Sequence, residues 1–339
     1  MNRRTALGLG TVATAGALAA AGTTAWAEQT GTDDAPAAAA TSPRQAAASV
    51  RRVYQAKSAR AGGTWNSAIS VANADGTLTP AVQDKPDDVV QAYSVNKVAV
   101  ATALLDKVDR GLLTLNQRVD VTADIVIPDG DGIFRLDGAY PSSVTLGHVL
   151  AALLTVSDDT AVRLCGLLTT SAEINQIIAA KGFPHTQVEP VANPHRFFLG
   201  TTTPRETHDL FQALVRGTVL SAASSGYLLG LLRSPIAFTD GIRRTMSSDE
   251  RARIATKAGW FADGRNEAGI MFDNGGRPVL TYAMFSAGAP DPDNFGATHP
   301  AVQARALMGR SFLDIINRLA GPTAARPMST RRYRPVNGG

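Results

Sequence analysis

The sequence predicts an α+β fold, in which segments from the two ends of the chain form one antiparallel sheet layer flanked by helices. Three observations support this prediction. Residues 69–77 and 251–287 carry strand and hairpin signals, whereas residues 94–206 carry helical spacing and helix caps. Because the helical segments lie between the two groups of strands, we expect an inserted all-helical lobe. The cleft between this lobe and the sheet layer is the expected place for a functional site.

The composition is that of a globular protein. The chain has 339 residues, of which 44% are hydrophobic and 18% are charged, which is enough for one large domain or two modest ones. Its one cysteine, Cys165, excludes an intramolecular disulfide and cysteine-ligated clusters, and its histidines lack metal-ligand spacing. The formal net charge of +4 gives little support to a nucleic-acid partner. We therefore expect neither a bound metal nor a bound nucleic acid.

The first 27 residues have the pattern of a secretory signal peptide. Arg3 and Arg4 precede an apolar stretch rich in alanine and glycine, and residues 25–27, Ala-Trp-Ala, resemble a cleavage site. Adjacent arginines are typical of twin-arginine export signals. The apolar stretch has too few large apolar side chains to span a bilayer comfortably. We expect export and cleavage, which would leave no stable membrane anchor and would lower the net charge from +4 to +2.

Three segments follow the signal peptide. Residues 28–45 are small and polar without apolar periodicity, as in a flexible linker. Residues 46–320 form one continuous globular domain without an internal repeat. Residues 321–339 form a basic tail that we expect to be disordered and solvated.

The domain is predicted to open with a hairpin and a helix. Ile69 and Val71 alternate with small or polar residues and lead into an Asp-Gly turn at residues 74–77. From residue 94 to residue 110, apolar residues recur at helical spacing, and Gly111 stands where a left-handed C-cap belongs. This pattern places Ser94 at a helix N-terminus.

The middle of the chain is predicted to be helical. Helices are expected over residues 145–154 and 160–168. Thr170 and Glu173 have the spacing of a capping box at the start of another helix. Residues 203–206, Thr-Pro-Arg-Glu, start a further helix, with proline at the first helical position and the glutamate completing the box.

The end of the chain returns to strands. Three strands are predicted over residues 251–259, 267–273 and 278–287, and an Asn-Gly-Gly turn at residues 274–276 joins the last two. A final helix is predicted over residues 300–319.

Ser94-Val95-Asn96-Lys97 is the first segment that carries chemistry. Residues three apart share a helix face, so the Lys97 amine can reach the Ser94 hydroxyl, and the free N–H groups at the helix start favour an oxyanion. A serine hydroxyl is too weakly acidic to attack unaided and needs a base within hydrogen-bond reach. Lys97 is a candidate for that base, although an isolated S-x-x-K pattern is common by chance.

Further segments make the pattern specific. Ser157-Asp158-Asp159 lies between two predicted helices, and Lys257-Ala258-Gly259 closes a predicted strand. Residues 189–193 read Glu-Pro-Val-Ala-Asn, and residues 201–204 read Thr-Thr-Thr-Pro. In this order the segments resemble the class A enzymes of the serine β-lactamase and penicillin-binding protein superfamily. The resemblance covers residues 46–320 and implies the fold of that superfamily, with the active site in the cleft.

The resemblance implies a nucleophile and its proton-transfer partners. Ser94 would attack the lactam carbonyl, with Lys97 as its hydrogen-bonded partner. Ser157 would pass a proton to the leaving nitrogen, and Lys257 would hold the Ser157 hydroxyl and attract the substrate carboxylate. The backbone N–H groups of Ser94 and Trp260 would form the oxyanion hole.

The resemblance also implies residues for deacylation and for substrate binding. Glu189, together with Asn193, would position and deprotonate the water that hydrolyses the acyl-enzyme. Either Lys97 or Glu189 could be the base for acylation, and the sequence leaves this choice open. Arg243, in preference to Arg244, would offer a second positive group to the substrate carboxylate.

Several substrate-binding positions depart from the family pattern. Asp159 stands where an asparagine usually donates to the substrate amide carbonyl, and an ionised carboxylate cannot donate. Ala258, next to the usual Gly259, replaces a hydroxyl residue that helps to bind the substrate carboxylate, a loss of about 1 kcal/mol or more. The segment over residues 193–204 is also shorter than in the family. These departures predict weak or altered turnover.

Together these features predict a secreted serine β-lactamase that works through an acyl-enzyme on Ser94 with Glu189-assisted deacylation. Two alternatives remain open. One is a hydrolase of the same superfamily that acts on peptidoglycan peptides or esters. The other is a catalytically feeble protein that is acylated by β-lactams and retains them. The expected partner is a small β-lactam or a cell-wall peptide-like substrate, with no cofactor, and the chain is expected to be a monomer.

Overall fold

A computed structural model of the chain describes residues 42–319 and residue 336. The predicted signal peptide, residues 28–41 of the predicted linker, and all of the predicted tail except residue 336 lie outside the described residues. The predicted linker ends earlier than expected, because helix α1 (Pro43–Ala61) begins at a proline after the capping residue Ser42. Within the described residues, no helix has both the length and the apolar character needed to span a membrane.

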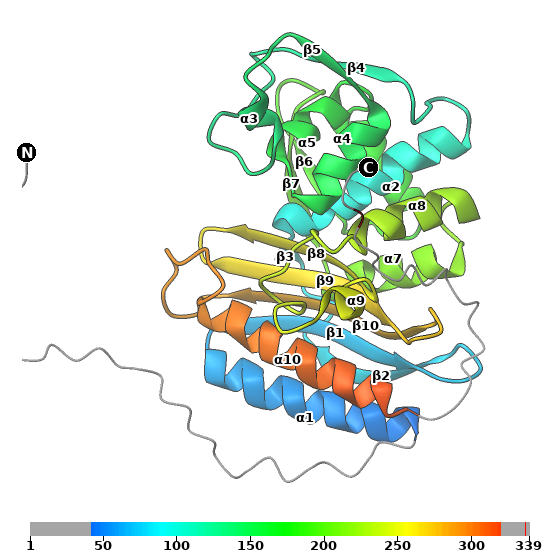
Figure 1. The fold of residues 1–339 in the computed structure, drawn as a ribbon, viewed down its shortest axis with the longest axis vertical. Coiled ribbons are helices and arrows are strands. Elements are labelled where there is room, and N and C mark those ends of the chain that lie inside the picture. Colours follow the sequence, from blue (N-terminus) through cyan, green and yellow to red (C-terminus); the bar gives the residue numbers. More distant parts are fainter. Residues whose placement is uncertain (1–41, 320–335, 337–339) are drawn as a thin grey trace, which may run out of the picture. The chain divides into compact units, whose positions relative to one another are not determined.

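One five-stranded antiparallel sheet, in the order β2-β1-β10-β9-β8, forms the middle layer of the domain (Figure 1). Its strands come from the two ends of the domain, which confirms the predicted α+β layer. The strands are β1 (Thr64–Ala72), β2 (Leu78–Asp84), β8 (Ile254–Phe261), β9 (Gly264–Phe272) and β10 (Pro278–Ala287). Strand β8, which carries the Lys257 motif, is an edge strand of this sheet.

Two turns of the sheet occur at Asp-Gly pairs in the sequence. The predicted Asp-Gly turn joins β1 to β2, and the Asp75 carboxylate accepts a hydrogen bond from Thr77 N at 2.9 Å. The predicted strands over residues 251–259 and 267–273 form a tight hairpin, because β8 continues to Phe261 and β9 already begins at Gly264. Ala262 makes this turn with a left-handed φ of 46°. The Asp-Gly pair at residues 263–264 is the turn signal that marks this hairpin.

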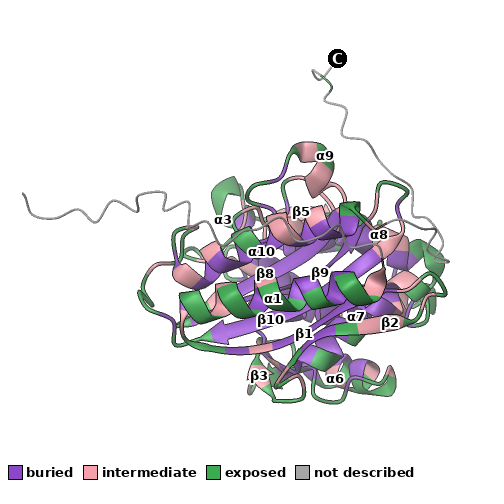
Figure 2. Cartoon of the chain, turned by 90° about the horizontal axis from the view of Figure 1, so that it is seen from below, coloured by how far each residue is buried: buried purple, intermediate pink, exposed green. Residues whose placement is uncertain are grey.

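Two helices, α1 and α10 (Pro300–Asn317), cover one face of the sheet (Figure 1). In Figure 2, the sides of these helices that meet the sheet are buried and their outer sides are exposed. The apolar core between the helices and the sheet includes Ile69, Met271, Tyr282, Phe312 and Leu313. The predicted final helix is therefore confirmed, with Pro300 as its first residue.

The helical lobe packs on the opposite face of the sheet (Figure 1). This lobe confirms the prediction of a helical insertion between the two groups of strands. Its larger helices are α2 (Lys97–Asp109), α4 (Leu146–Thr155), α5 (Asp159–Gly166), α6 (Ser171–Ala180), α7 (Pro204–Arg216) and α8 (Ala222–Leu232). A second apolar core joins sheet residues such as Ile270 and Phe285 to lobe residues such as Leu104 and Leu150.

Short elements connect these layers. They are β3 (Val90–Gln91), the 3₁₀ helix η1 (Tyr93–Asn96), β4 (Arg118–Val121), α3 (Phe134–Asp137), β5 (Ser142–Thr145), β6 (Gln187–Pro190), β7 (Phe197–Thr202) and α9 (Ser248–Arg251). β3, β7 and β6 form a small sheet, and β4 pairs with β5. The β6–β7 hairpin carries the segment that contains Glu189.

Two of the three helix caps that the sequence predicts are formed in full. Gly111 follows α2 with a left-handed φ of 72°, and Thr170 and Glu173 form the predicted capping box of α6. Thr203 caps α7 as predicted, but Glu206 does not complete a box. Its carboxylate instead accepts hydrogen bonds from backbone and side-chain groups of residues 185–186.

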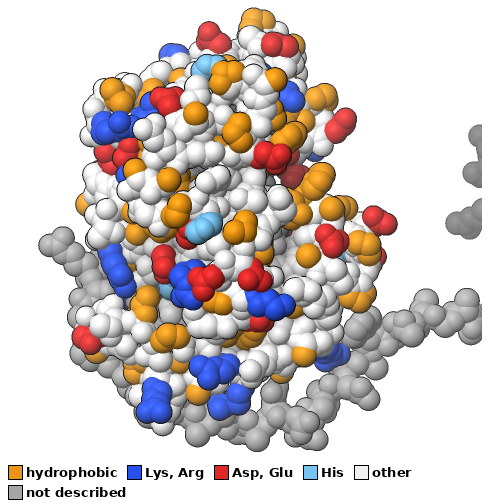
Figure 3. Space-filling model, turned by 180° about the vertical axis from the view of Figure 1, so that it is seen from behind, with side chains coloured by type: hydrophobic (Ala, Val, Ile, Leu, Met, Phe, Trp, Pro, Cys, Tyr) orange, Lys and Arg blue, Asp and Glu red, His pale blue; other side chains and the backbone are white. Residues whose placement is uncertain are grey.

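Charged side chains on the surface pair locally. Arg310 bridges Glu250 at 2.9 Å and Asp314 at 2.6 Å, and acidic and basic side chains are interspersed on the face shown in Figure 3. Exposed pairs of this kind contribute about 1 kcal/mol or less each. The two apolar cores therefore dominate the stability of the fold.

Candidate active site

Ser94 lies in the 3₁₀ helix η1, which leads directly into α2. The sequence predicts Ser94 at a helix N-terminus, and the structure places this 3₁₀ turn before the α-helix. Ser94 is half-buried, and the preceding Tyr93 has a left-handed φ of 49°. Such a conformation is costly for a residue other than glycine and is frequent at functional sites.

The edge strand β8 packs its backbone against the Ser94 turn. A Cβ atom at Gly259 would lie 2.7 Å from Ser94 N and 2.8 Å from Val95 N, so only glycine permits this approach. Alternate N–H groups on the free side of an edge strand have no strand partner. The pairing of Ser94 and Trp260 N–H groups as an oxyanion hole stays a prediction that this packing favours. The side chain of Ala258 is 0% exposed and adds no surface to the site.

Lys97 is fully buried, and its amine donates to three acceptors. They are the Ser157 carbonyl at 2.5 Å, the Ser157 hydroxyl at 3.1 Å and the Asp159 carboxylate at 2.8 Å. An ammonium group has three N–H bonds, so these partners use all of them. Among the described residues no hydrogen bond joins Lys97 to Ser94. This differs from the predicted pairing, because Ser157 and Asp159 take the amine instead.

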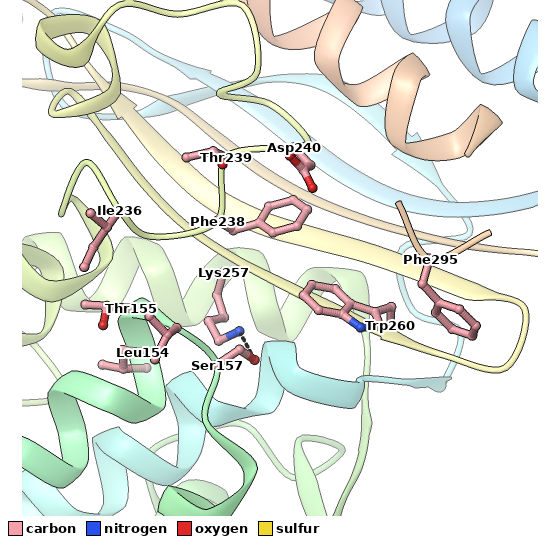
Figure 4. A pocket seen from close by; sticks show the side chains of 11 residues that line it. Leu154, Thr155, Ser157, Ile236, Phe238, Thr239, Asp240, Lys257, Trp260 and Phe295 are labelled. Atoms are coloured by element: carbon pink, nitrogen blue, oxygen red, sulfur yellow. Dashed lines mark hydrogen bonds between the residues drawn. The ribbon is translucent and has the colours of Figure 1, made fainter. Parts of the chain in front are cut away.

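Ser157 is held between two lysines. It follows α4 with a left-handed φ of 56°, and its Oγ is hydrogen-bonded to Lys97 at 3.1 Å and to Lys257 at 2.9 Å. Figure 4 shows the bond to Lys257. The Lys257 amine also donates to the Ala258 carbonyl at 2.7 Å. The structure therefore brings together four residues from three predicted motifs: Lys97, Ser157, Asp159 and Lys257.

Burial dominates the titration of both lysines. It lowers the pKa of Lys257 well below its ordinary value, and the charge of Lys97 lowers that pKa further. The carboxylates that raise the pKa of Lys257 are those of Asp159, Asp131 and Glu267. Burial also lowers the pKa of Lys97, but Asp159 opposes this effect by its charge and its hydrogen bond. Of the two amines, only that of Lys97 has a carboxylate as a direct partner among the described residues.

The two aspartates after Ser157 fix the neighbouring loop. Asp158 caps α5 by accepting from Ala161 N at 2.9 Å, and it also accepts from the N–H groups of residues 133–134. Asp159 accepts from Asp131 N at 3.0 Å. Burial, and then the charge of Asp159, raise the pKa of Asp131. Asp131 lies beside the site, although none of the sequence motifs includes it. The glycines on either side of it indicate a turn and no function.

Asn96 ties the Ser94 turn to the β6–β7 hairpin. Its side chain is 3% exposed, and its amide nitrogen lies 2.7–3.2 Å from the carbonyls of Gln187, Leu199 and Thr201. The Ala92 N–H adds a bond to the Gly200 carbonyl at 2.9 Å. The hairpin is thus positioned by the residue next to Lys97. The sequence motifs assign no role to this residue.

Glu189 and Asn193 lie on that hairpin and its connection. Glu189 is exposed and pairs with Phe198 in the strand ladder, and its carboxylate forms no hydrogen bond or ion pair with another described residue. Asn193 is also exposed, and its side-chain oxygen accepts from His195 N at 2.9 Å, which closes a local turn. The shared role of Glu189 and Asn193 in water activation stays a prediction.

Arg243 lies in the protein interior and not in the substrate cleft. Its side chain is 0% exposed, and its guanidinium donates to the backbone carbonyls of Leu232, Ser234, Ala237 and Ile254. These bonds hold the loop after α8 against the start of β8. The predicted contact between Arg243 and a substrate carboxylate is therefore wrong, because the buried guanidinium has no approach to a ligand.

A cavity of about 230 Å³ opens beside Ser157 and Lys257 (Figure 4). Phe238 and Trp260 form part of its wall, with ring centroids 5.5 Å apart and planes inclined by 35°. The carboxylate of Asp240 also lines it. No motif in the sequence marks the segment that supplies Phe238 and Asp240. The other lining residues are Leu154, Thr155, Val156, Ile236, Thr239 and Phe295.

Comparisons with known proteins identify the family and the fold. The sequence model described as "Beta-lactamase enzyme family" matches residues 45–316. No curated protein sequence matches the chain.

The fold is similar to that of several solved structures. A β-lactamase from Sphaerobacter thermophilus DSM 20745 is 22% identical, with a TM-score of 0.66 over 79% of this chain and 96% of that one. A β-lactamase from Xanthomonas campestris pv. campestris str. ATCC 33913 is 19% identical, with a TM-score of 0.67 over 80% and 98%. PBP-A is 21% identical, with a TM-score of 0.61 over 78% and 96%. Because the family match spans most of the described domain, the chain belongs to the β-lactamase enzyme family, among the β-lactamase and transpeptidase-like serine hydrolases.

Proposed function

We propose that Ser94 is the nucleophile of a class A-like serine hydrolase that is acylated by β-lactams. The observation that carries this proposal is the Ser157 hydroxyl, bonded to the Lys97 and Lys257 amines, together with Gly259 of the Lys257 strand, which packs against the Ser94 turn. A hydroxyl bonded to two buried amines can relay a proton between a nucleophile and a base. The close approach of the Gly259 backbone to Ser94 N supports an oxyanion hole formed with β8.

Lys257 accepts the proton in this proposal. All three N–H bonds of the Lys97 ammonium are directed at acceptors, one of which is a carboxylate. This favours the charged form of Lys97, and a charged amine cannot act as a base. As Ser94 Oγ bonds to the lactam carbonyl carbon, its proton moves to Ser157 Oγ while the Ser157 proton moves to Lys257 Nζ. When the carbon–nitrogen bond breaks, the proton returns by the same path to the leaving nitrogen. Lys97 stays an ammonium and stabilises the negative charge of the intermediate.

Deacylation is the step in which activity is expected to be weak. Glu189 is proposed to deprotonate the attacking water, with Asn193 beside it. The Glu189 carboxylate is exposed and has no described partner to fix it, so the water is held loosely. This observation favours a second candidate function, a β-lactam-binding protein with a long-lived acyl-enzyme.

Mass spectrometry of residues 28–339 after brief exposure to penicillin tests the proposal. Acylation by the parent and none by Ser94→Ala are expected. A short-lived adduct together with rapid hydrolysis of a chromogenic cephalosporin indicates a β-lactamase, and a persistent adduct indicates the binding protein. Absence of any adduct and of any hydrolysis would refute both.

Export is a separate proposal. The twin arginines, the apolar stretch and the Ala-Trp-Ala site of residues 1–27 support secretion with cleavage after residue 27. N-terminal sequencing of the protein recovered from the culture medium should find Glu28 first. Retention of the full chain inside the cell would contradict it.

A further inference from the structure

The wall of the cavity beside Ser157 and Lys257 suits a positively charged group. We propose that the cavity is a subsite for the ammonium or a similar cation of a substrate, seated against the Asp240 carboxylate and the ring faces of Phe238 and Trp260. This inference rests on the function proposed above and names the substrate class of that same site.

Asp240 supplies the negative charge of the subsite. It is an exposed residue that lines the cavity (Figure 4), and it forms no hydrogen bond or ion pair with another described residue. A carboxylate without a partner at a concave surface attracts a cation and repels an anion. A ligand that brings an ammonium group to this wall gains a partner that the protein itself does not supply.

The aromatic wall favours the same charge. The inclined rings of Phe238 and Trp260 lie beside Asp240, and the negative face of an aromatic ring attracts a cation within about 6 Å. A third lining ring, Phe295, already carries the Arg265 guanidinium at 4.2 Å from its centroid. Arg265 does not itself line the cavity, so the rings of Phe238 and Trp260 are the ones that we assign to a ligand cation.

The basic side chains near the cavity are already engaged. Arg243 and Arg265 donate to backbone carbonyls, and Lys97 is paired with Asp159. Lys257 is the one basic residue among the described residues that line the cavity, and its amine is bonded to the Ser157 hydroxyl and a carbonyl. A ligand carboxylate would meet a single, occupied amine and the like charge of Asp240.

The position of the cavity assigns the cation to one side of the scissile bond. Ser157 returns the proton to the leaving group in the proposed mechanism, and Ser157 lines the cavity. The leaving part of the substrate therefore enters it. The substrate class is an amide or ester whose leaving part carries an amine separate from the scissile bond, as a diamine or an amino alcohol does. A penicillin, whose carboxylate lies on this side, is a poorer match.

Ligand binding to the Ser94→Ala protein tests the subsite without turnover. Three probes of similar size differ in charge: 2-phenylethylammonium, 2-phenylethanol and phenylacetate. Calorimetric titration near neutral pH is expected to show the ammonium probe binding about tenfold more tightly than phenylacetate. Adding Asp240→Asn should abolish the preference. Adding Asp120→Asn, an exposed aspartate of β4 outside the cavity lining, should leave it intact.

The outcomes separate the subsite from the proposed function. Absence of binding, equal affinity for the three probes, tighter binding of phenylacetate, or a preference that survives Asp240→Asn would overturn the subsite. Acylation of Ser94 by penicillin is measured separately on the parent protein. Loss of the cation preference with intact acylation refutes the subsite alone. An intact preference without acylation supports the subsite and refutes the proposed function.

Discussion

Lys97 and Asp159 form a partly buried ion pair, with Lys97 Nζ 2.8 Å from Asp159 Oδ1. The lysine side chain is 0% exposed and the aspartate side chain 35% exposed. The pair favours the charged amine, because loss of its proton would leave the carboxylate without its partner. A charged amine cannot accept a proton from a nucleophile. The ion pair therefore supports the proposal that Lys257, and not Lys97, is the base.

Asp159→Asn is expected to move the acid limb of the acylation pH profile to lower pH. The carboxylate raises the pKa of both lysines, so its removal lowers both pKa values and leaves more neutral amine at a given pH. Stopped-flow acylation by a chromogenic cephalosporin across the acidic and neutral range measures this shift. A limb that stays in place, or that moves to higher pH, would contradict the assignment.

Arginine substitutions separate the roles of the two lysines. Arginine keeps a positive charge but does not accept a proton in proteins. Lys257→Arg should reduce the acylation rate about a hundredfold or more, the usual value of a general base, whereas Lys97→Arg should reduce it about tenfold or less. Thermal unfolding shows whether each variant folds. The reverse ranking in two folded variants would return the role of base to Lys97.

Gly259→Ala is expected to damage the site more than the fold. The added methyl would lie within 3 Å of the N atoms of Ser94 and Val95, so β8 must move away from the nucleophile. A misplacement of about 1 Å can cost a hundredfold in rate. Gly226→Ala is the matched control, since nothing lies within 4 Å of its added methyl and its helix gains up to about 1 kcal/mol. Equal acylation rates in the two variants would refute the proposed packing.

Short-range signals were enough to predict the layers of the fold and part of the site. Alternating strands, capping residues and Asp-Gly turns act within a few residues, so the two ends of the domain could be assigned to one sheet. The order of the motifs then placed Ser157 and Lys257 together, and their hydrogen bond of 2.9 Å agrees with it. The predicted hydrogen bond between Lys97 and Ser94 is not formed, and Asp159, two residues after Ser157, is one of the groups that bind the Lys97 amine instead.

Other features of the site depend on contacts that no local pattern encodes. Nothing in the sequence around Arg243 distinguishes it from an arginine on the surface. Only the fold shows that its guanidinium donates to four backbone carbonyls. Asp240 and Phe238 belong to a loop without a motif, and they reach the cavity because that loop folds back on β8. Asn96 has partners about a hundred residues away in the chain, so its role follows from tertiary structure alone.

Protonation of His299 is expected to lower the free energy of unfolding in acid. Burial and the charges of Arg265 and Arg305 lower its pKa from 6.5 to about 4, so between these values the unfolded chain binds a proton that the folded protein does not. Stability should fall as pH falls through this window, by at most about 3 kcal/mol from this residue. His299→Asn keeps an acceptor for the α10 cap and removes the titration. Urea unfolding at a series of pH values should show a shallower acid slope in the variant, and parallel curves would exclude this role.

Asn96→Leu tests whether the β6–β7 hairpin serves deacylation. The substitution removes the amide that is bonded to three hairpin carbonyls, and the hairpin carries Glu189. If Glu189 activates the water, the variant should lose more in the rate of acyl-enzyme hydrolysis than in the rate of acylation. Glu189→Gln should slow hydrolysis about a hundredfold, the contribution of a general base. Burst kinetics with a chromogenic cephalosporin separates the two rates. A parent-like hydrolysis rate in Glu189→Gln would show that another group activates the water, and Asp131, which is held beside Asp159, would then be the next carboxylate to substitute.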